Sequence, residues 1–190
     1  MSTETVVLGA ILTALVIVLQ LVGTFTAFFG PFSTALALIP IAIGAIMCGP
    51  FIGMWLGFVF GVVVIVTGGA ALFFAYSVPG TVITVLLKGA ACGFVSGLVY
   101  KLLGKWNRIV GAITAAIICP VVNTAVFLLG GAIFFLPHSE AIAAEQGMAV
   151  TGMALFWAFA MANFIFEVGL CTVLSPVIVR ILNIRKKEGK

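Results

Sequence analysis

Long apolar runs, interrupted by few charged residues, constrain what this chain can fold into. A helix needs about 20 apolar residues to cross a hydrocarbon core about 30 Å thick. Runs of this length are typical of transmembrane helices. Charged residues make up 7% of the chain and aspartate is absent, whereas a soluble domain is about one quarter charged. The sequence therefore predicts an all-α integral membrane protein.

Glycine, proline and polar residues divide the apolar sequence into six runs. The clearest breaks are Gly49-Pro50 and the polar stretch 137–147. Pro120 and Pro176 are predicted to bend the fifth and sixth runs. We expect a single membrane domain over residues 1–190, with six transmembrane helices at about 5–23, 34–47, 51–67, 80–103, 109–136 and 148–182.

Basic residues predict the orientation in the membrane. They cluster in residues 101–108 and in the C-terminal tail. The loops at the other end carry none, and residues 137–147 include Glu140 and Glu145. Cytoplasmic loops are enriched in lysine and arginine, so the basic loop and the C-terminus are predicted to be cytoplasmic. An even number of spans then puts the N-terminus in the cytoplasm too.

Glycine recurs every fourth residue on the third and fourth predicted helices. Small residues at this spacing let two backbones approach closely, and close packing drives helix association in lipid. We interpret the stripes as internal contacts of one bundle, with a dimer interface as the alternative. The stripes are Gly49, Gly53, Gly57 and Gly61 on one helix, and Gly89, Gly93 and Gly97 on the other.

Two opposite charges, Lys88 and Glu167, lie deep inside apolar runs. Such a residue costs about 2.5 kcal/mol or more at the bilayer centre, so it usually faces the bundle interior or a cavity. Thr84 shares a helix face with Lys88, as Asn163 does with Glu167, and Asn123 lies on the fifth helix. Counted from the outer helix ends, Lys88 lies about 13 Å deep, the asparagines about 20 Å and Glu167 about 25 Å. These groups are predicted to converge on a small-molecule pocket.

A structural role is the alternative for the same residues. Lys88 and Glu167 would then neutralise each other, and Asn123 and Asn163 would form hydrogen bonds between helices. The sequence is compatible with both interpretations, a small-molecule pocket and a structural role.

The predicted outer loops hold further candidates. Thr26 and Phe29 lie in the first outer loop, where they would form a lid over the pocket. His138 follows Pro137 at the start of the last outer loop, and it is either solvated or in contact with a ligand.

Several classes of function lack their sequence patterns here. There is no GxxxxGK[ST] loop for ATP, and no HExxH or GxSxG pattern of a hydrolase. A single histidine and four cysteines without metal-ligand spacing predict no metal site. The basic residues sit at helix ends, which predicts no nucleic-acid partner. We expect a membrane binding protein that is not an enzyme, uses no cofactor and depends on a partner for energy.

Three stretches carry a resemblance to a known family. The first helix contains Ala10-Ile11-Leu12-Thr13-Ala14, an AxxxA face, and residues 36–61 and 79–103 are long stretches marked by proline and glycine. With six spans and cytoplasmic termini, this layout resembles the S component of an energy-coupling factor (ECF) vitamin transporter. The AxxxA face is similar to the one with which S components dock on their membrane partner, so Ala10 and Ala14 would form a docking strip.

The resemblance implies a mechanism and a set of partners. An S component of the prokaryotic plasma membrane binds a vitamin from outside and docks on a membrane T component with two cytoplasmic ATPases. It then topples in the membrane and carries its pocket inward. Substrate contacts in the family come from helices four to six and from the first loop. Here that points to Lys88, Asn123, Asn163 and Glu167.

The pocket candidates favour pantothenate as the substrate. Lys88 would face the carboxylate of this small, flexible anion, and the asparagines would face its hydroxyl and amide groups. The few aromatic residues expected at the deepest level argue against a large flat ring. Cobalamin and a pyridine or pyrimidine vitamin stay open. From a different class, a structural or assembly subunit whose charged pair only fixes helix packing stays open too.

The orientation can be tested with an impermeant thiol reagent in a background without the four native cysteines. We expect Glu145→Cys to react in intact cells and Lys105→Cys to react only after permeabilisation, because the basic loop is predicted to be cytoplasmic. The reverse pattern would place the predicted pocket on the cytoplasmic side.

Overall fold

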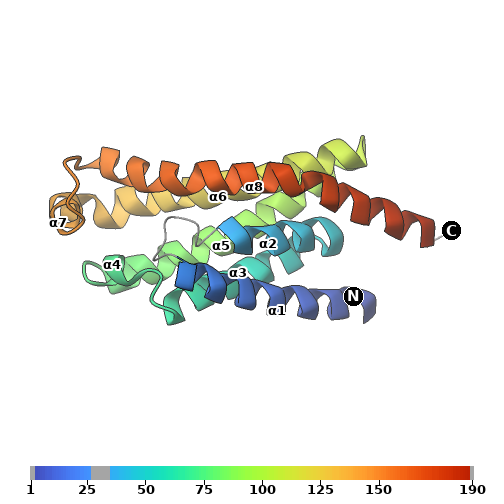
Figure 1. Ribbon diagram of the computed structural model, residues 1–190, viewed down its shortest axis with the longest axis horizontal. Coiled ribbons are helices and arrows are strands. Elements are labelled where there is room, and N and C mark those ends of the chain that lie inside the picture. The colour runs from blue at the N-terminus through green and yellow to red at the C-terminus, as the bar shows by residue number, and fades with distance from the viewer. Residues whose placement is uncertain (1–2, 27–34, 189–190) are drawn as a thin grey trace.

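The chain was analysed as a computed structural model, which describes residues 3–26 and 35–188. These residues form an elongated helical bundle, with no strand in the described ranges (Figure 1). The elements are α1 (Thr3–Thr26), α2 (Ala35–Cys48), α3 (Pro50–Val66), α4 (Ala71–Phe74), α5 (Val78–Leu103), α6 (Arg108–Gly130), the π-helical turn η2 (Gly131–Phe135), the 3-10 turn η3 (Leu136–His138), α7 (Ser139–Glu145) and α8 (Met153–Glu188).

Four helical segments in the described ranges are long and apolar enough to cross a membrane: Thr3–Thr24, Val78–Leu103, Arg108–Glu145 and Met153–Thr172. Two shorter apolar helices, Leu36–Cys48 and Pro50–Val66, occupy the positions of the second and third predicted spans. The all-helical membrane class is thus confirmed. The count of six crossings and the cytoplasmic location of the termini stay predictions.

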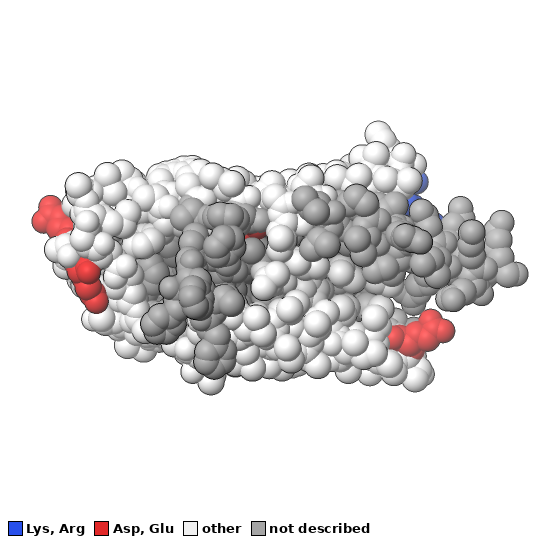
Figure 2. Space-filling model, viewed as in Figure 1, with Lys and Arg blue, Asp and Glu red and all other residues white. Residues whose placement is uncertain are grey.

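The two ends of the bundle differ in the elements they carry. The start of α1 and the end of α8 lie at one end, whereas α4 and α7 lie at the other (Figure 1). On the face drawn in Figure 2, the coloured charged side chains gather mainly at these two ends, with a broad uncharged band between them. Such a band is what a hydrocarbon core requires of the surface that touches it.

Local sequence signals explain where the helices begin. Gly49 adopts φ 97°, a left-handed conformation that favours glycine, and Pro50 then opens α3. At the start of α5 the Ser77 hydroxyl accepts a hydrogen bond from the backbone N–H of Gly80 at 3.2 Å. Asn107 caps α6 in the same way. Between the predicted spans 51–67 and 80–103 the structure adds the short helix α4, and α5 begins directly after the Ser77 cap.

The two glycine stripes face each other inside the bundle. A Cβ added at Gly53 would lie 2.5 Å from the carbonyl oxygen of Gly93, and one added at Gly57 would overlap the carbonyl of Gly89. Only glycine therefore fits at these positions where α3 meets α5. The hydroxyl of Ser96 extends the packing to α6, because it donates to the carbonyl of Ala115 at 2.8 Å.

Two apolar clusters flank the middle of the bundle. One joins α1, α2 and α3 around buried Leu12, Leu38 and Phe60. The other joins η2, α7 and α8 around buried Phe135 and Phe156. The residues that the sequence singled out on α5, α6 and α8 lie between these clusters.

The glycine contact predicts a specific stability effect. Gly57→Ala should lower the melting temperature, because the methyl group meets the Gly89 backbone and overpacking costs about 1–3 kcal/mol. Gly169→Ala in α8 is the matched control, since a Cβ at Gly169 meets nothing within 4 Å. Thermal unfolding in detergent compares the two; equal stability of both variants would contradict the close α3–α5 contact.

Candidate functional site

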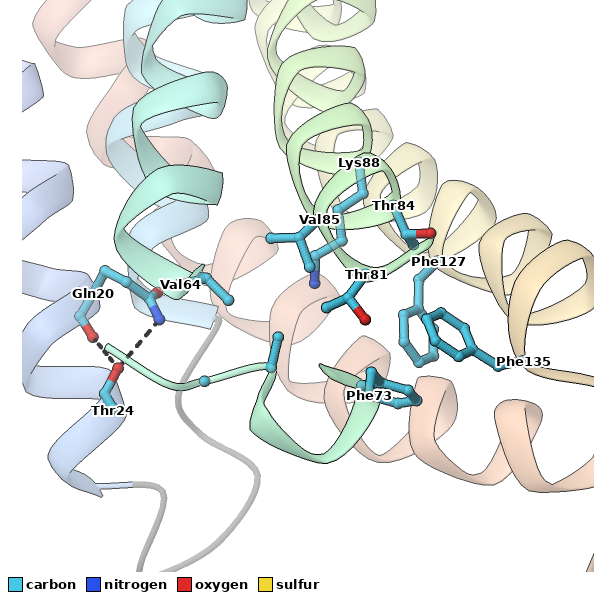
Figure 3. A pocket seen from close by; sticks show the side chains of 12 residues that line it. Gln20, Thr24, Val64, Phe73, Thr81, Thr84, Val85, Lys88, Phe127 and Phe135 are labelled. Carbon is cyan, nitrogen blue, oxygen red and sulfur yellow. Dashed lines mark hydrogen bonds between the residues drawn. The ribbon is translucent and has the colours of Figure 1, made fainter. Parts of the chain in front are cut away.

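Two adjoining cavities lie inside the bundle. The larger has a volume of about 120 Å³ and the smaller about 60 Å³, and Lys88 and Phe127 line both of them. Figure 3 shows the larger cavity, which is bounded by α1, α3, α5, α6 and the segment around α4. Because α4 lies at the end opposite the termini, the larger cavity is displaced toward that end (Figure 1).

Lys88 is the cation at the junction of the two cavities. Its side chain is half-buried, and its Nζ lies 5.9 Å from the ring centroid of Phe60 and 5.7 Å from that of Phe127. Both distances are within the range of cation–π attraction. Among the described residues the ammonium has no hydrogen-bond or ion-pair partner. Two aromatic rings thus hold a positive charge beside an internal cavity.

The smaller cavity holds the predicted carboxylate and both asparagines. Glu167 is 1% exposed, and the Nδ2 of Asn123 lies 3.4 Å and 3.5 Å from its two oxygens. Asn163 lines the same cavity and donates through Nδ2 to the carbonyl of Phe159 at 3.3 Å. Glu167 also acts electrostatically on Lys88. The structure therefore brings together the four polar residues on which the sequence prediction depended.

Three buried polar oxygens around the cavities have no hydrogen-bond partner in the described part of the chain. They are Gln20 Oε1, Thr84 Oγ1 and Asn123 Oδ1. Gln20 and Thr84 line the larger cavity and Asn123 the smaller. Buried polar groups in folded proteins are nearly always paired, so unpaired ones need a specific explanation. Their gathering at two cavities indicates groups that a bound molecule would satisfy.

Gln20 was not among the residues predicted from the sequence. It comes from α1 and is 2% exposed. The signal was present, since an amide in the middle of an apolar run is as unusual as the two asparagines that were selected. It was passed over because the expected contacts were confined to helices four to six and the first loop.

Aromatic side chains form more of the cavity wall than the sequence reading expected. Phe73, Phe127 and Phe135 line the larger cavity, and Phe159 lines the smaller. The ring of Phe73 lies 5.1 Å from that of Phe135 and 5.8 Å from that of Phe127, between centroids. Phe73 lies on α4 and Phe135 on the π-helical turn η2, two short elements that apolar periodicity did not reveal.

Of the remaining loop candidates, the structure describes the side chain of His138 alone, and this residue lines neither cavity. His138 is exposed, and its ring lies 5.6 Å from that of Tyr76. The Tyr76 hydroxyl donates to Glu145 at 2.9 Å, and this hydrogen bond raises the pKa of Tyr76 above its ordinary value. Thr26 ends α1 with its side chain outside the described part, and Phe29 lies outside the described residues.

The predicted docking strip lies on the outside of the bundle. Ala10 and Ala14 are exposed on α1, whereas Gly9 and Leu12 of the same helix are buried. Exposed Ile11 lies on the same outward side as the alanines. A surface of small and apolar side chains on an outer helix suits contact with lipid or with another membrane helix.

A family profile described as "ECF transporter, substrate-specific component" matches residues 4–179. Comparison with curated proteins and with solved structures gives no match. Because the profile spans most of the chain, the chain belongs to this family of substrate-binding membrane transport subunits.

Proposed function

We propose that this chain captures a small, water-soluble organic anion in the two adjoining cavities and delivers it through an ECF importer. Pantothenate is the favoured substrate. The observation that carries this proposal is the Lys88 ammonium, which borders both cavities and makes no ion-pair contact or hydrogen bond with a described residue, although the Glu167 carboxylate acts on it electrostatically. A charge in an apolar bundle is costly unless something compensates it, and a carboxylate would do so.

The smaller cavity supplies polar groups for the uncharged part of such a substrate. Asn163 and Thr124 line it together with Asn123, whose Oδ1 is unpaired. Amides and hydroxyls at this position suit the hydroxyl and amide groups of a pantothenate-like molecule. The aromatic walls would cover its apolar carbon atoms. Glu167 holds Asn123 in place from α8 and so helps to orient the site.

The route of delivery follows from the family. We propose that the chain docks through the Ala10–Ala14 strip on a T component driven by two cytoplasmic ATPases, and that it topples to move the cavities inward. Support comes from the exposure of both alanines and from the displacement of the larger cavity toward the end opposite the termini. With cytoplasmic termini, this end would face outward and receive the substrate.

A structural role for the polar cluster is the second candidate. The hydrogen bonds from Asn123 to Glu167 join α6 to α8 and favour it. In that case the chain would be an assembly subunit, and Lys88 and Glu167 would matter only for packing.

A double-mutant cycle separates the two candidates. Lys88→Met should weaken pantothenate binding at least about 10-fold, because a charge-assisted contact in a desolvated site is lost. The double variant Lys88→Met with Glu167→Gln should not recover this affinity, although its thermal stability should exceed that of Lys88→Met. Isothermal titration and thermal unfolding measure the two quantities, with exposed Lys101→Met as the control. Full recovery of binding in the double variant would assign both residues to packing.

Docking is tested by separating uptake from binding. Ala10→Leu and Ala14→Leu should abolish uptake of radiolabelled pantothenate by cells that express the complete importer, since added bulk blocks close helix contact. Binding by the purified variants should stay as in the wild type, because both positions are exposed and away from the cavities. Ala144→Leu, at an exposed position of α7, is the control and should leave uptake unchanged. Loss of binding in the α1 variants would show that the strip supports the core.

A further inference from the structure

Gln20 is held by a short polar chain at the α1 side of the larger cavity. Its Nε2 lies 3.4 Å from Thr24 Oγ1 (Figure 3). Thr24 Oγ1 lies 3.3 Å from Thr67 Oγ1. The Thr24 hydroxyl donates to the Gln20 main-chain carbonyl at 3.0 Å. The Thr67 hydroxyl donates to the carbonyl of Val63 at 2.8 Å. Either hydroxyl can be the donor between Thr24 and Thr67, so their two protons serve the two backbone carbonyls and the contact between the hydroxyls.

The hydrogen bonds of Thr24 orient the Gln20 amide. Thr24 Oγ1 accepts from the Gln20 Nε2, and the backbone carbonyl of Gln20 and the Thr67 hydroxyl are the groups to which Thr24 can donate its own proton. The other atom, Oε1, is then turned away from Thr24, and it is the one left without a partner. An amide oxygen accepts hydrogen bonds and never donates them. Gln20 therefore adds an acceptor to the wall of a cavity that also contains the Lys88 cation.

We infer that Gln20 is a specificity-determining residue whose Oε1 requires a hydrogen-bond donor, a hydroxyl or amide N–H, on the molecule whose anionic group lies at Lys88. This inference rests on the proposed function, because it assumes that the cavity holds an organic anion. The two residues and the apolar wall between them define a substrate class: an anion at one end, an apolar body, and a donor at the other end. A dicarboxylate would place a second acceptor against Oε1 and is rejected.

The experiment compares pantothenate with two analogues that keep its carboxylate. One has hydrogen in place of the hydroxyl groups, and the other carries a methyl group on the amide nitrogen. The wild type should bind pantothenate about 10-fold tighter than at least one analogue, as expected for one lost hydrogen bond in a buried site. Gln20→Met, which keeps the side-chain length without the oxygen, should erase that preference and leave the affinity for the analogue unchanged. The control Gln146→Met, at an exposed position outside both cavities, should keep the preference for pantothenate over the analogue.

A preference that survives in Gln20→Met overturns the inference while leaving the proposed function intact. If the wild type binds none of the three molecules, the pantothenate form of the proposed function fails. The role of Gln20 is then decided by the melting temperature of the ligand-free protein. If the melting temperature of Gln20→Met equals or exceeds that of the wild type, the result supports a ligand-binding role for Gln20 Oε1. The reason is that removing an unpaired buried oxygen relieves a desolvation cost. A lower value assigns Gln20 to structure and overturns the inference.

Discussion

The backbone contact between Gly57 and Gly89 is the constraint on which the site depends. It brings α3 against α5 at a distance that only glycine allows, and the residue next to Gly89 is Lys88. Phe60 lies one turn after Gly57 on α3, and close helix approach carries its ring over the ammonium. Side-chain bulk at the contact would separate the cation from the ring. The packing that joins the two helices in lipid therefore also creates the environment of the charge.

The site draws on elements from both halves of the chain. α1 and α3 contribute the Gln20 side, α5 contributes Lys88 and Thr84, and α6 and α8 contribute the carboxylate and the asparagines. The short elements α4 and η2 add aromatic rings at the end opposite the termini. A π-helical turn widens the helix locally and often occurs at functional sites. Here it places Phe135 in the wall without interrupting the long helical segment.

Sequence reasoning recovered the features that depend on composition and helical spacing. Apolar run length predicted the helices, the glycine period predicted close packing inside one bundle without naming the partner helices, and the cost of charge in lipid singled out Lys88 and Glu167. It could not recover features set by tertiary placement. His138 belongs to an exposed cluster with Tyr76, and Phe73 reaches the cavity from a four-residue helix that has no periodic signal. Gln20 was missed because contacts were expected from helices four to six and the first loop, and the contact that joins its neighbour Thr24 to Thr67 is set by tertiary placement.

Binding in the two cavities and the stability of the folded protein would be linked through the polar groups that line them. The Lys88 cation and the unpaired oxygens of Gln20, Thr84 and Asn123 each leave a desolvated polar group without full compensation. A buried polar group without a partner costs free energy, and a ligand that pairs with it removes this cost. A molecule that binds the folded state alone stabilises it by mass action, and satisfying several unpaired groups at once strengthens that effect. The same side chains would then determine both the affinity for the substrate and the difference in stability between the empty and the loaded protein.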